Sequence, residues 1–220
     1  MPENPARSSK QLLDPIELIS EILFGLIMVL TFTGSLSAVT AGREDVRTML
    51  LGAIGCNLAW GLIDAVMYVI ARFVERARNI LTVRAVRESA DPGKAQHVIA
   101  GALPPLLASV LSPAQLEAMR RQLKELPEPP TRPYFAGDDF RGAIVVFLLV
   151  FLSTFPVVIP FIFINNAMMA VRVSNGIAII LLFLCGYRLG HYAGHRPWRM
   201  GLSMAVIGSA LVGITMALGG

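Results

Sequence analysis

Residues 50–70 read LLGAIGCNLAWGLIDAVMYVI, an apolar run long enough to cross a membrane as one helix. Lipid offers the backbone no hydrogen-bond partners, so such a run must pair its own amide groups, as a helix does. Two polar side chains, Asn57 and Asp64, lie two turns apart in this run and therefore share one helix face. An ionised side chain inside a span costs about 2.5–3.5 kcal/mol on the mildest scale. We therefore expect Asp64 to face a partner or a water-filled path.

Four further segments have similar length and composition. Only 15% of the 220 residues are charged and 55% are hydrophobic, whereas a soluble domain carries about 25% charged residues. These features predict an all-α integral membrane protein that crosses the lipid bilayer with five transmembrane helices. The expected spans are residues 18–40, 48–73, 142–164, 174–192 and 198–218.

The basic residues predict the orientation of these spans. Lys and Arg beside a span mark its cytoplasmic side. Of the 19 Lys and Arg residues, only Arg43, Arg47 and Arg172 fall in loops that would lie outside if the N-terminus is cytoplasmic. We therefore predict a cytoplasmic N-terminus and an outside C-terminus. The Ala, Arg and Gly content favours a bacterial inner (plasma) membrane, and the basic charge needs no nucleic-acid partner to explain it.

A more polar segment separates the second and third spans. Its sequence predicts a basic helix over 74–88 that continues the second span, a short helix over 95–103, and a third helix that starts at a Ser112–Gln115 capping box and ends near residue 126. A proline-rich linker over 127–133 leads back to the membrane. The predicted organisation is an N-terminal cytoplasmic tail, spans one and two, a cytoplasmic helical insert with its linker, and spans three to five, at residues 1–13, 14–73, 74–140 and 141–220.

The first span carries its own polar stripe. Asp14 and Pro15 are typical of a helix start, as N-cap and first helical residue. Glu17, Glu21 and Met28 follow at helical spacing. Glu17 is explained either as a ligand or as an interfacial carboxylate on the positive end of the helix. Glu21 lies a turn deeper, where that explanation weakens.

A short loop joins the first two spans, which are therefore expected to be antiparallel neighbours. Glu21 and Asp64 lie at similar depths in the two spans, so their carboxyl groups could meet. The alternative pairs Asp64 with Arg72, Arg76 or a neighbouring hydroxyl as a structural contact. The sequence does not decide between these two interpretations.

Pro156 and Pro160 predict a kink or break in the third span, because proline lacks an amide donor and clashes with the preceding turn. Broken helices often line transport paths, but a kink can also serve packing alone. In the fourth span, Gly186, Gly190 and Gly194 form a small-residue ridge suited to close helix contact.

Enzyme motifs are missing from the sequence. It contains no glycine-rich phosphate loop, no nucleophile elbow and no Cys/His metal cluster. We therefore expect no enzyme activity and no resident cofactor.

Five spans with a helical insert after the second resemble the vacuolar iron transporter (VIT) family. Residues 21–25 (EILFG) are similar to the family's start of span one, residues 156–160 to its proline-bearing span three, and residues 196–200 to its approach to span five. The resemblance implies a homodimer in which spans one and two line a path for Fe²⁺ or a similar divalent ion. It also implies coupling to protons and an insert that binds metal through glutamates.

The chain departs from the family at the ligand positions. Met28-Val29 stands where the family has an aspartate–glycine pair, and Asn57 stands where it has a glutamate. The acidic residues of the insert are scattered among more numerous arginines.

The predicted function is proton-coupled export of Fe²⁺ or Mn²⁺ from the cytoplasm, since carboxylate oxygens with one soft sulfur suit these ions. The alternative is a divergent, non-transporting membrane partner or regulatory protein on the same scaffold. The predicted metal-site residues are Glu21, Asp64, Asn57, Met28 and Glu17, with Pro156 and Pro160 shaping the path.

Overall fold

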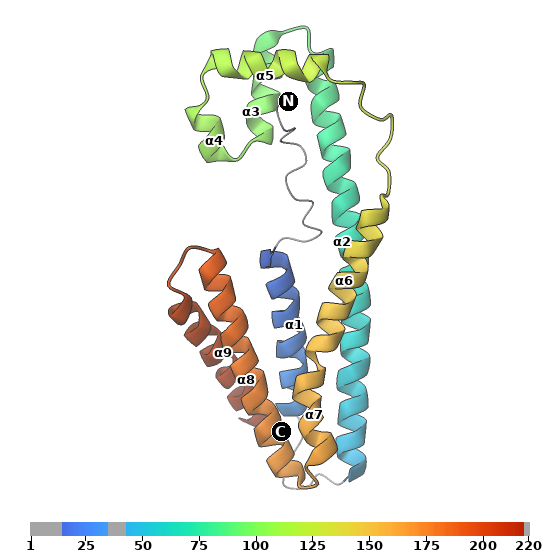
Figure 1. Ribbon diagram of the computed structural model, residues 1–220, viewed down its shortest axis with the longest axis vertical. Helices are drawn as coiled ribbons and strands as arrows, with labels where there is room; N and C mark the ends of the chain where they lie inside the picture. Colours follow the sequence, from blue (N-terminus) through green and yellow to red (C-terminus); the bar gives the residue numbers. More distant parts are fainter. Residues whose placement is uncertain (1–14, 35–42, 218–220) are drawn as a thin grey trace, which may run out of the picture. The chain divides into compact units, whose positions relative to one another are not determined.

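The computed structural model describes residues 15–34 and 43–217, and within these ranges it contains helices and no strand. The predicted N-terminal tail, Asp14 and the end of the first span lie outside the described residues. The helices, shown in Figure 1, are α1 (Pro15–Gly34), α2 (Arg43–Glu88), α3 (Pro92–Ala102), α4 (Pro105–Val110), α5 (Pro113–Glu125), α6 (Gly137–Ser153), α7 (Phe155–Phe163), α8 (Ala167–Tyr192) and α9 (Pro197–Ala217).

Five stretches among the described residues are long and apolar enough to cross a membrane, which confirms the predicted fold class. They are Ile16–Thr33, Val46–Glu88, Gly137–Phe163, Ala167–Tyr192 and Pro197–Thr215.

The chain also divides into two compact units, one of residues 1–68 with 138–220 and one of residues 69–137.

Three of the spans begin five or more residues before the expected position, and one of them is α6, which begins at Gly137 instead of residue 142. α2 begins at Arg43 rather than at the expected residue 48, and Glu44 in its first turn complements the positive end of the helix. α8 begins at Ala167 rather than near Ser174, because the Asn166 side chain accepts a 3.0 Å hydrogen bond from the Met169 amide and caps the helix. The Asn166 cap thus extends α8 beyond its apolar run.

The predicted break in the third span is confirmed. α6 ends at Ser153 and α7 begins at Phe155, with Thr154 between them. Pro156 has no amide hydrogen to donate to the carbonyl of Leu152, so the regular ladder stops there. Pro160 lies buried inside α7.

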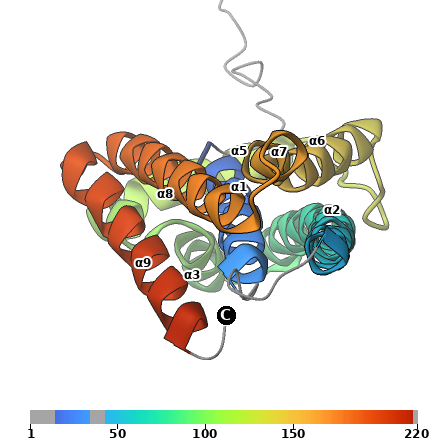
Figure 2. The same cartoon turned by 90° about the horizontal axis from the view of Figure 1, so that it is seen from below.

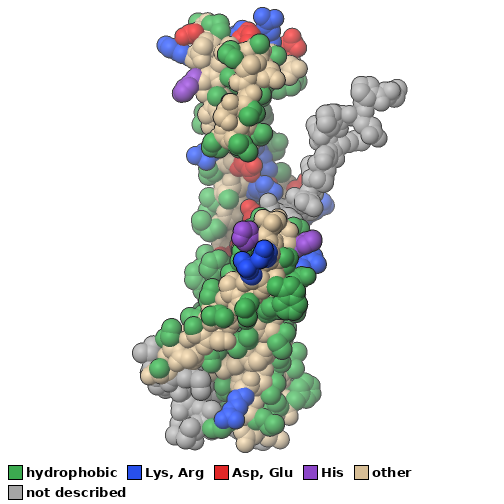
Figure 3. Space-filling model, turned by 90° about the vertical axis from the view of Figure 1, so that its left-hand side faces the viewer, with side chains coloured by type: hydrophobic (Ala, Val, Ile, Leu, Met, Phe, Trp, Pro, Cys, Tyr) green, Lys and Arg blue, Asp and Glu red, His purple; other side chains and the backbone are tan. Residues whose placement is uncertain are grey.

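The spanning unit packs around α1, which Figure 2 shows with α8 on one side and α2 on the other. Leu26 and Leu30 of α1 are fully buried, and the same core includes Val157 of α7 and Leu182 of α8. Because lipid is as apolar as these side chains, close packing rather than water exclusion holds such helices together. Hydrophobic side chains cover most of the face drawn in Figure 3, and basic and histidine side chains gather where α8 and α9 are joined.

Small residues allow α8 and α9 to approach closely. A Cβ atom on Gly186 would lie 2.8 Å from the Met200 carbonyl oxygen, and one on Gly190 would lie 2.9 Å from Pro197 Cα. Gly194 belongs to the turn after α8, where its φ of 64° favours glycine. The ridge therefore consists of Gly186 and Gly190, and the inclusion of Gly194 was wrong.

The second unit has a small core of its own. Val86 of α2 packs with Ala95 and Ile99 of α3, and α5 covers them with apolar side chains. The predicted capping box at the start of α5 is present, since Ser112 and Gln115 each bond the other's backbone amide. The six-residue helix α4 was not predicted, because a helix of this length next to prolines is too short to show a helical repeat of apolar residues.

Glu117 joins α5 to α3. It accepts hydrogen bonds from Arg120 at 2.6 and 2.8 Å and from the Gln96 amide of α3 at 3.2 Å. Chiefly the Arg120 bond, and next the Gln96 bond, lower the pKa of Glu117 from 4.5 to about 2. Glu117 therefore links α5 to α3 through a hydrogen bond to a charged acceptor.

Gly186→Ala should destabilise the α8–α9 contact, because the added methyl group meets a backbone oxygen that cannot move aside alone. Overpacking of this kind costs about 1–3 kcal/mol, measurable as a lower thermal midpoint in detergent. Gly176→Ala is the matched control in the same helix, since its Cβ would contact nothing within 4 Å. Equal midpoints for the two variants would contradict the packing.

Glu117 should make the second unit sensitive to acid. A carboxyl group with a lowered pKa stabilises the folded state above its ordinary value of 4.5 and loses that contribution as the pH falls toward 2. Amide hydrogen exchange of α3 and α5 should therefore speed up over this range in the native chain. Glu117→Gln should flatten the dependence, whereas Glu125→Gln in the same helix should retain it; an unchanged profile in Glu117→Gln would refute the assignment.

Candidate metal site

A pocket of about 270 Å³ lies among α1, α2 and α6 in the spanning unit. Because two acidic side chains face it, we call it the carboxylate pocket. Its lining residues are Glu21, Phe24, Gly25 and Met28 of α1, Trp60 and Asp64 of α2, and Val150 of α6. Three of the five predicted site residues, Glu21, Met28 and Asp64, thus line one cavity.

The carboxyl groups of Glu21 and Asp64 lie within hydrogen-bonding reach of each other across α1 and α2. A hydrogen bond between two carboxyl groups requires a proton on one of them. The structure therefore agrees with the first interpretation of Asp64, in which it meets Glu21. In the second unit, Arg72 bonds Glu75 at 3.1 Å and Arg76 bonds the Tyr134 carbonyl at 2.6 Å.

Met28 brings a soft donor to the same pocket. The Cys56 thiol of α2 lies 3.1 Å from the Met28 sulfur and donates to it, which orients the thioether. Cys56 was not among the residues predicted for the site. Its position one turn before Trp60 on α2 was the available signal, but a cysteine in an apolar helix is usually a small packing residue.

Asn57 is fully buried but does not line the pocket. Its side-chain nitrogen donates to the Gly25 carbonyl of α1 at 3.4 Å and to the Thr154 hydroxyl at the α6–α7 break. Its Oδ1 atom has no hydrogen-bond partner among the described residues. A buried acceptor without a donor is costly, so this oxygen is available to a cation or a water molecule.

The remaining predicted residues lie around this centre. Glu17 is exposed in the first turn of α1, close enough for its charge to act on Glu21. Pro156 stands at the start of α7, and Pro160 is buried within that helix. Sequence analysis missed Thr154 because an isolated threonine in an apolar run carries no signal until the break brings it beside α2.

The donor set defines what the pocket can hold. Among residues 15–34 and 43–217, no three Asp, Glu, His or Cys side chains come together at metal-binding distance. The pocket offers two carboxyl groups and one thioether, a mixture that suits Fe²⁺ or Mn²⁺ with the remaining positions filled by water or backbone oxygen.

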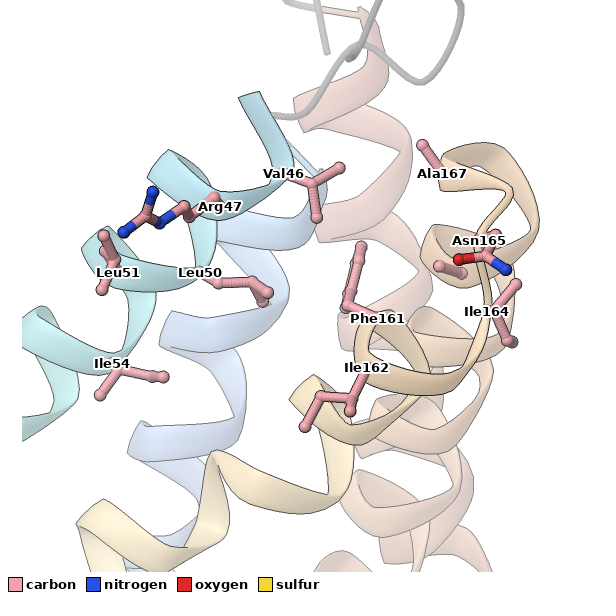
Figure 4. A pocket seen from close by; sticks show the side chains of 11 residues that line it. Val46, Arg47, Leu50, Leu51, Ile54, Phe161, Ile162, Ile164, Asn165 and Ala167 are labelled. Atoms are coloured by element: carbon pink, nitrogen blue, oxygen red, sulfur yellow. The ribbon is translucent and has the colours of Figure 1, made fainter. Parts of the chain in front are cut away.

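A second hollow, which we call the apolar groove, lies nearer the N-terminal end of α2 than the carboxylate pocket and is shown in Figure 4. It has a volume of about 700 Å³. Its lining residues are Val46, Arg47, Leu50, Leu51 and Ile54 of α2, Phe161 and Ile162 of α7, Ile164 and Asn165 of the following turn, and Ala167 and Ala170 of α8. Arg47 contributes the only charged side chain among these lining residues.

Gly25 sets the distance between α1 and α6 at the pocket. A Cβ there would overlap the Ser153 hydroxyl and lie 3.1 Å from the Val150 carbonyl oxygen. Gly25→Ala should therefore lower the thermal midpoint in detergent, and Ser153→Ala in the same chain should restore part of the loss. Gly55→Ala on α2, with open space at its Cβ, is the control; no loss in Gly25→Ala would show that α1 and α6 are not in close contact.

The sequence comparison agrees with the resemblance. Residues 112–220, from just before α5 to beyond α9, match the sequence profile of the VIT family. No curated protein matches the chain. The matched region excludes α1 and α2, so Glu21 and Asp64 lie outside it. The match over residues 112–220 and the five candidate spanning helices together support a member of the VIT family, a family of membrane metal-ion transporters.

Proposed function

We propose that this protein exports Fe²⁺ or Mn²⁺ from the cytoplasm in exchange for protons, with Glu21 and Asp64 as the acidic ligands. The observation that carries the proposal is the close pair of carboxyl groups that lines one cavity among three helices. Ionisable groups at such depth are expensive and usually mark a substrate or proton path. Membership of a metal-ion transport family supports the same conclusion.

The exchange follows from the pair's need for a proton. Without a cation, a proton shared by the two carboxyl groups removes the repulsion between two negative charges. A divalent ion supplies the missing positive charge, so its entry releases the proton and its departure restores it. Met28 adds a soft ligand, which favours Fe²⁺ and Mn²⁺ over Mg²⁺ and Ca²⁺.

The direction and the surroundings belong to the same proposal. The clustering of Lys and Arg in residues 72–141 favours a cytoplasmic second unit, so that export carries the ion toward the Arg43 end of α2. The membrane is proposed to be a bacterial inner membrane. Exposed apolar residues along α2, such as Leu58, Leu62 and Met67, leave a face for lipid or for a second copy in a homodimer.

The alternative is a non-transporting member that acts as a membrane partner or regulatory protein. The observation that favours it is the small acidic donor set, since the described residues place only two carboxyl groups in the pocket. The two functions differ in whether a metal ion drives proton movement.

Metal-dependent proton flux in proteoliposomes separates them. Wild-type protein should move protons when Fe²⁺ or Mn²⁺ is offered. Glu21→Gln and Asp64→Asn keep side-chain size but remove the acidic ligands, and each should reduce the flux at least about tenfold. Glu44→Gln, an acidic residue at the start of α2 outside the pocket, should retain it. Absence of flux from correctly folded wild type would favour the non-transporting alternative.

A further inference from the structure

The carboxylate pocket and the apolar groove are both lined by α2 and by the broken span that α6 and α7 form. On α2, Trp60 lines the pocket and Ile54 lines the groove, with Asn57 midway between them. On the broken span, Val150 lines the pocket and Phe161 lines the groove, with Thr154 between them. At 1.5 Å per helical residue, Asn57 is about 4.5 Å along the axis from each α2 neighbour.

The residues between the two hollows form a closed layer. Asn57 and Thr154 are both buried and hydrogen-bonded to each other. Ala53 of α2 and Val157 of α7 are fully buried beside them. A cation could not pass from pocket to groove without parting this layer.

The same two side chains offer ligands once they separate. Asn57 Oδ1 already lacks a hydrogen-bond partner among the described residues. Separation would also free the Thr154 hydroxyl, and Pro156 leaves the Leu152 carbonyl without its helical donor. Neutral oxygens of this kind replace the water shell of an ion without holding it tightly.

We propose that Asn57 and Thr154 form a gate between the carboxylate pocket and the apolar groove, closed in this structure by their mutual hydrogen bond. The inference rests on the proposed transport function and adds a positioning role for Thr154. Opening moves α7 relative to α2 about the Thr154 break, where the helix is already interrupted. The exposed, positively charged Arg47 lines the groove (Figure 4) and repels a bound cation. The groove is therefore the side on which we expect the ion to be released.

Cysteine accessibility tests the gate without relying on transport. In a background with Cys56→Ala and Cys185→Ala, Val150→Cys reports on the pocket and Ile54→Cys on the groove. A charged, membrane-impermeant methanethiosulfonate reagent is added to proteoliposomes of known orientation from either side. Val150→Cys should react from one side only, and Ile54→Cys from the opposite side only.

Thr154→Val removes the hydroxyl at nearly constant shape, so the layer should part more often. Each reporter should then react from both sides, with labelling from the formerly closed side rising about fivefold or more. Asn57→Ala provides a second variant with the same expected effect, and Thr154→Ser should preserve one-sided labelling. Asn175→Ala is the matched control, since it removes a buried 3.0 Å bond to Thr33 away from both hollows.

The outcomes separate the gate from the proposed cargo. One-sided labelling that persists in both Thr154→Val and Asn57→Ala would overturn the gate, even if metal flux is intact. A reporter that reacts from both sides, or from neither, while Thr154 is intact would overturn it as well. Gated labelling without any metal flux would retain the gate and refute the metal cargo.

Discussion

The contact between Glu21 and Asp64 governs the arrangement of the first three spans. Each acidic side chain alone would be a costly group in an apolar helix. One proton between the two groups would let them satisfy each other, provided that α1 and α2 lie side by side with the two residues at equal depth. The pair therefore fixes the register of the two helices, and the pocket around it is a consequence of that register.

Small residues and a helix break complete the site. Gly25 lets α6 approach α1 at the pocket, and Gly61 lets α2 approach the Phe147 carbonyl oxygen of α6. The break at Thr154 then turns a hydroxyl toward Asn57, which ties α1, α2 and the broken span at one point. Close contacts hold α6 before Thr154, and Pro156 interrupts the backbone hydrogen-bond ladder after it.

The sequence predicts the helices well because long apolar runs, prolines and capping residues act locally. The five spans, the break near Pro156 and the Ser112 cap all follow from such signals. Contacts between side chains of different helices cannot be predicted in this way, since they depend on the rotation of α1, α2 and α6 about their axes. Thr154 and the Cys56–Met28 contact emerge only from that packing. The family match covers residues 112–220 and gives no help with the ligands on α1 and α2.

Equilibrium binding of Mn²⁺ tests the central claim most directly, because it separates ion binding from movement across the membrane. Binding is measured as the loss of the electron paramagnetic resonance signal of free Mn²⁺ when purified protein in detergent is added. The number of protons released is measured by titration calorimetry in buffers of different ionisation enthalpy. The account predicts one Mn²⁺ per carboxylate pocket, released protons, and loss of both in Asp64→Asn. Undiminished Mn²⁺ binding in a chain that carries both Glu21→Gln and Asp64→Asn would contradict it.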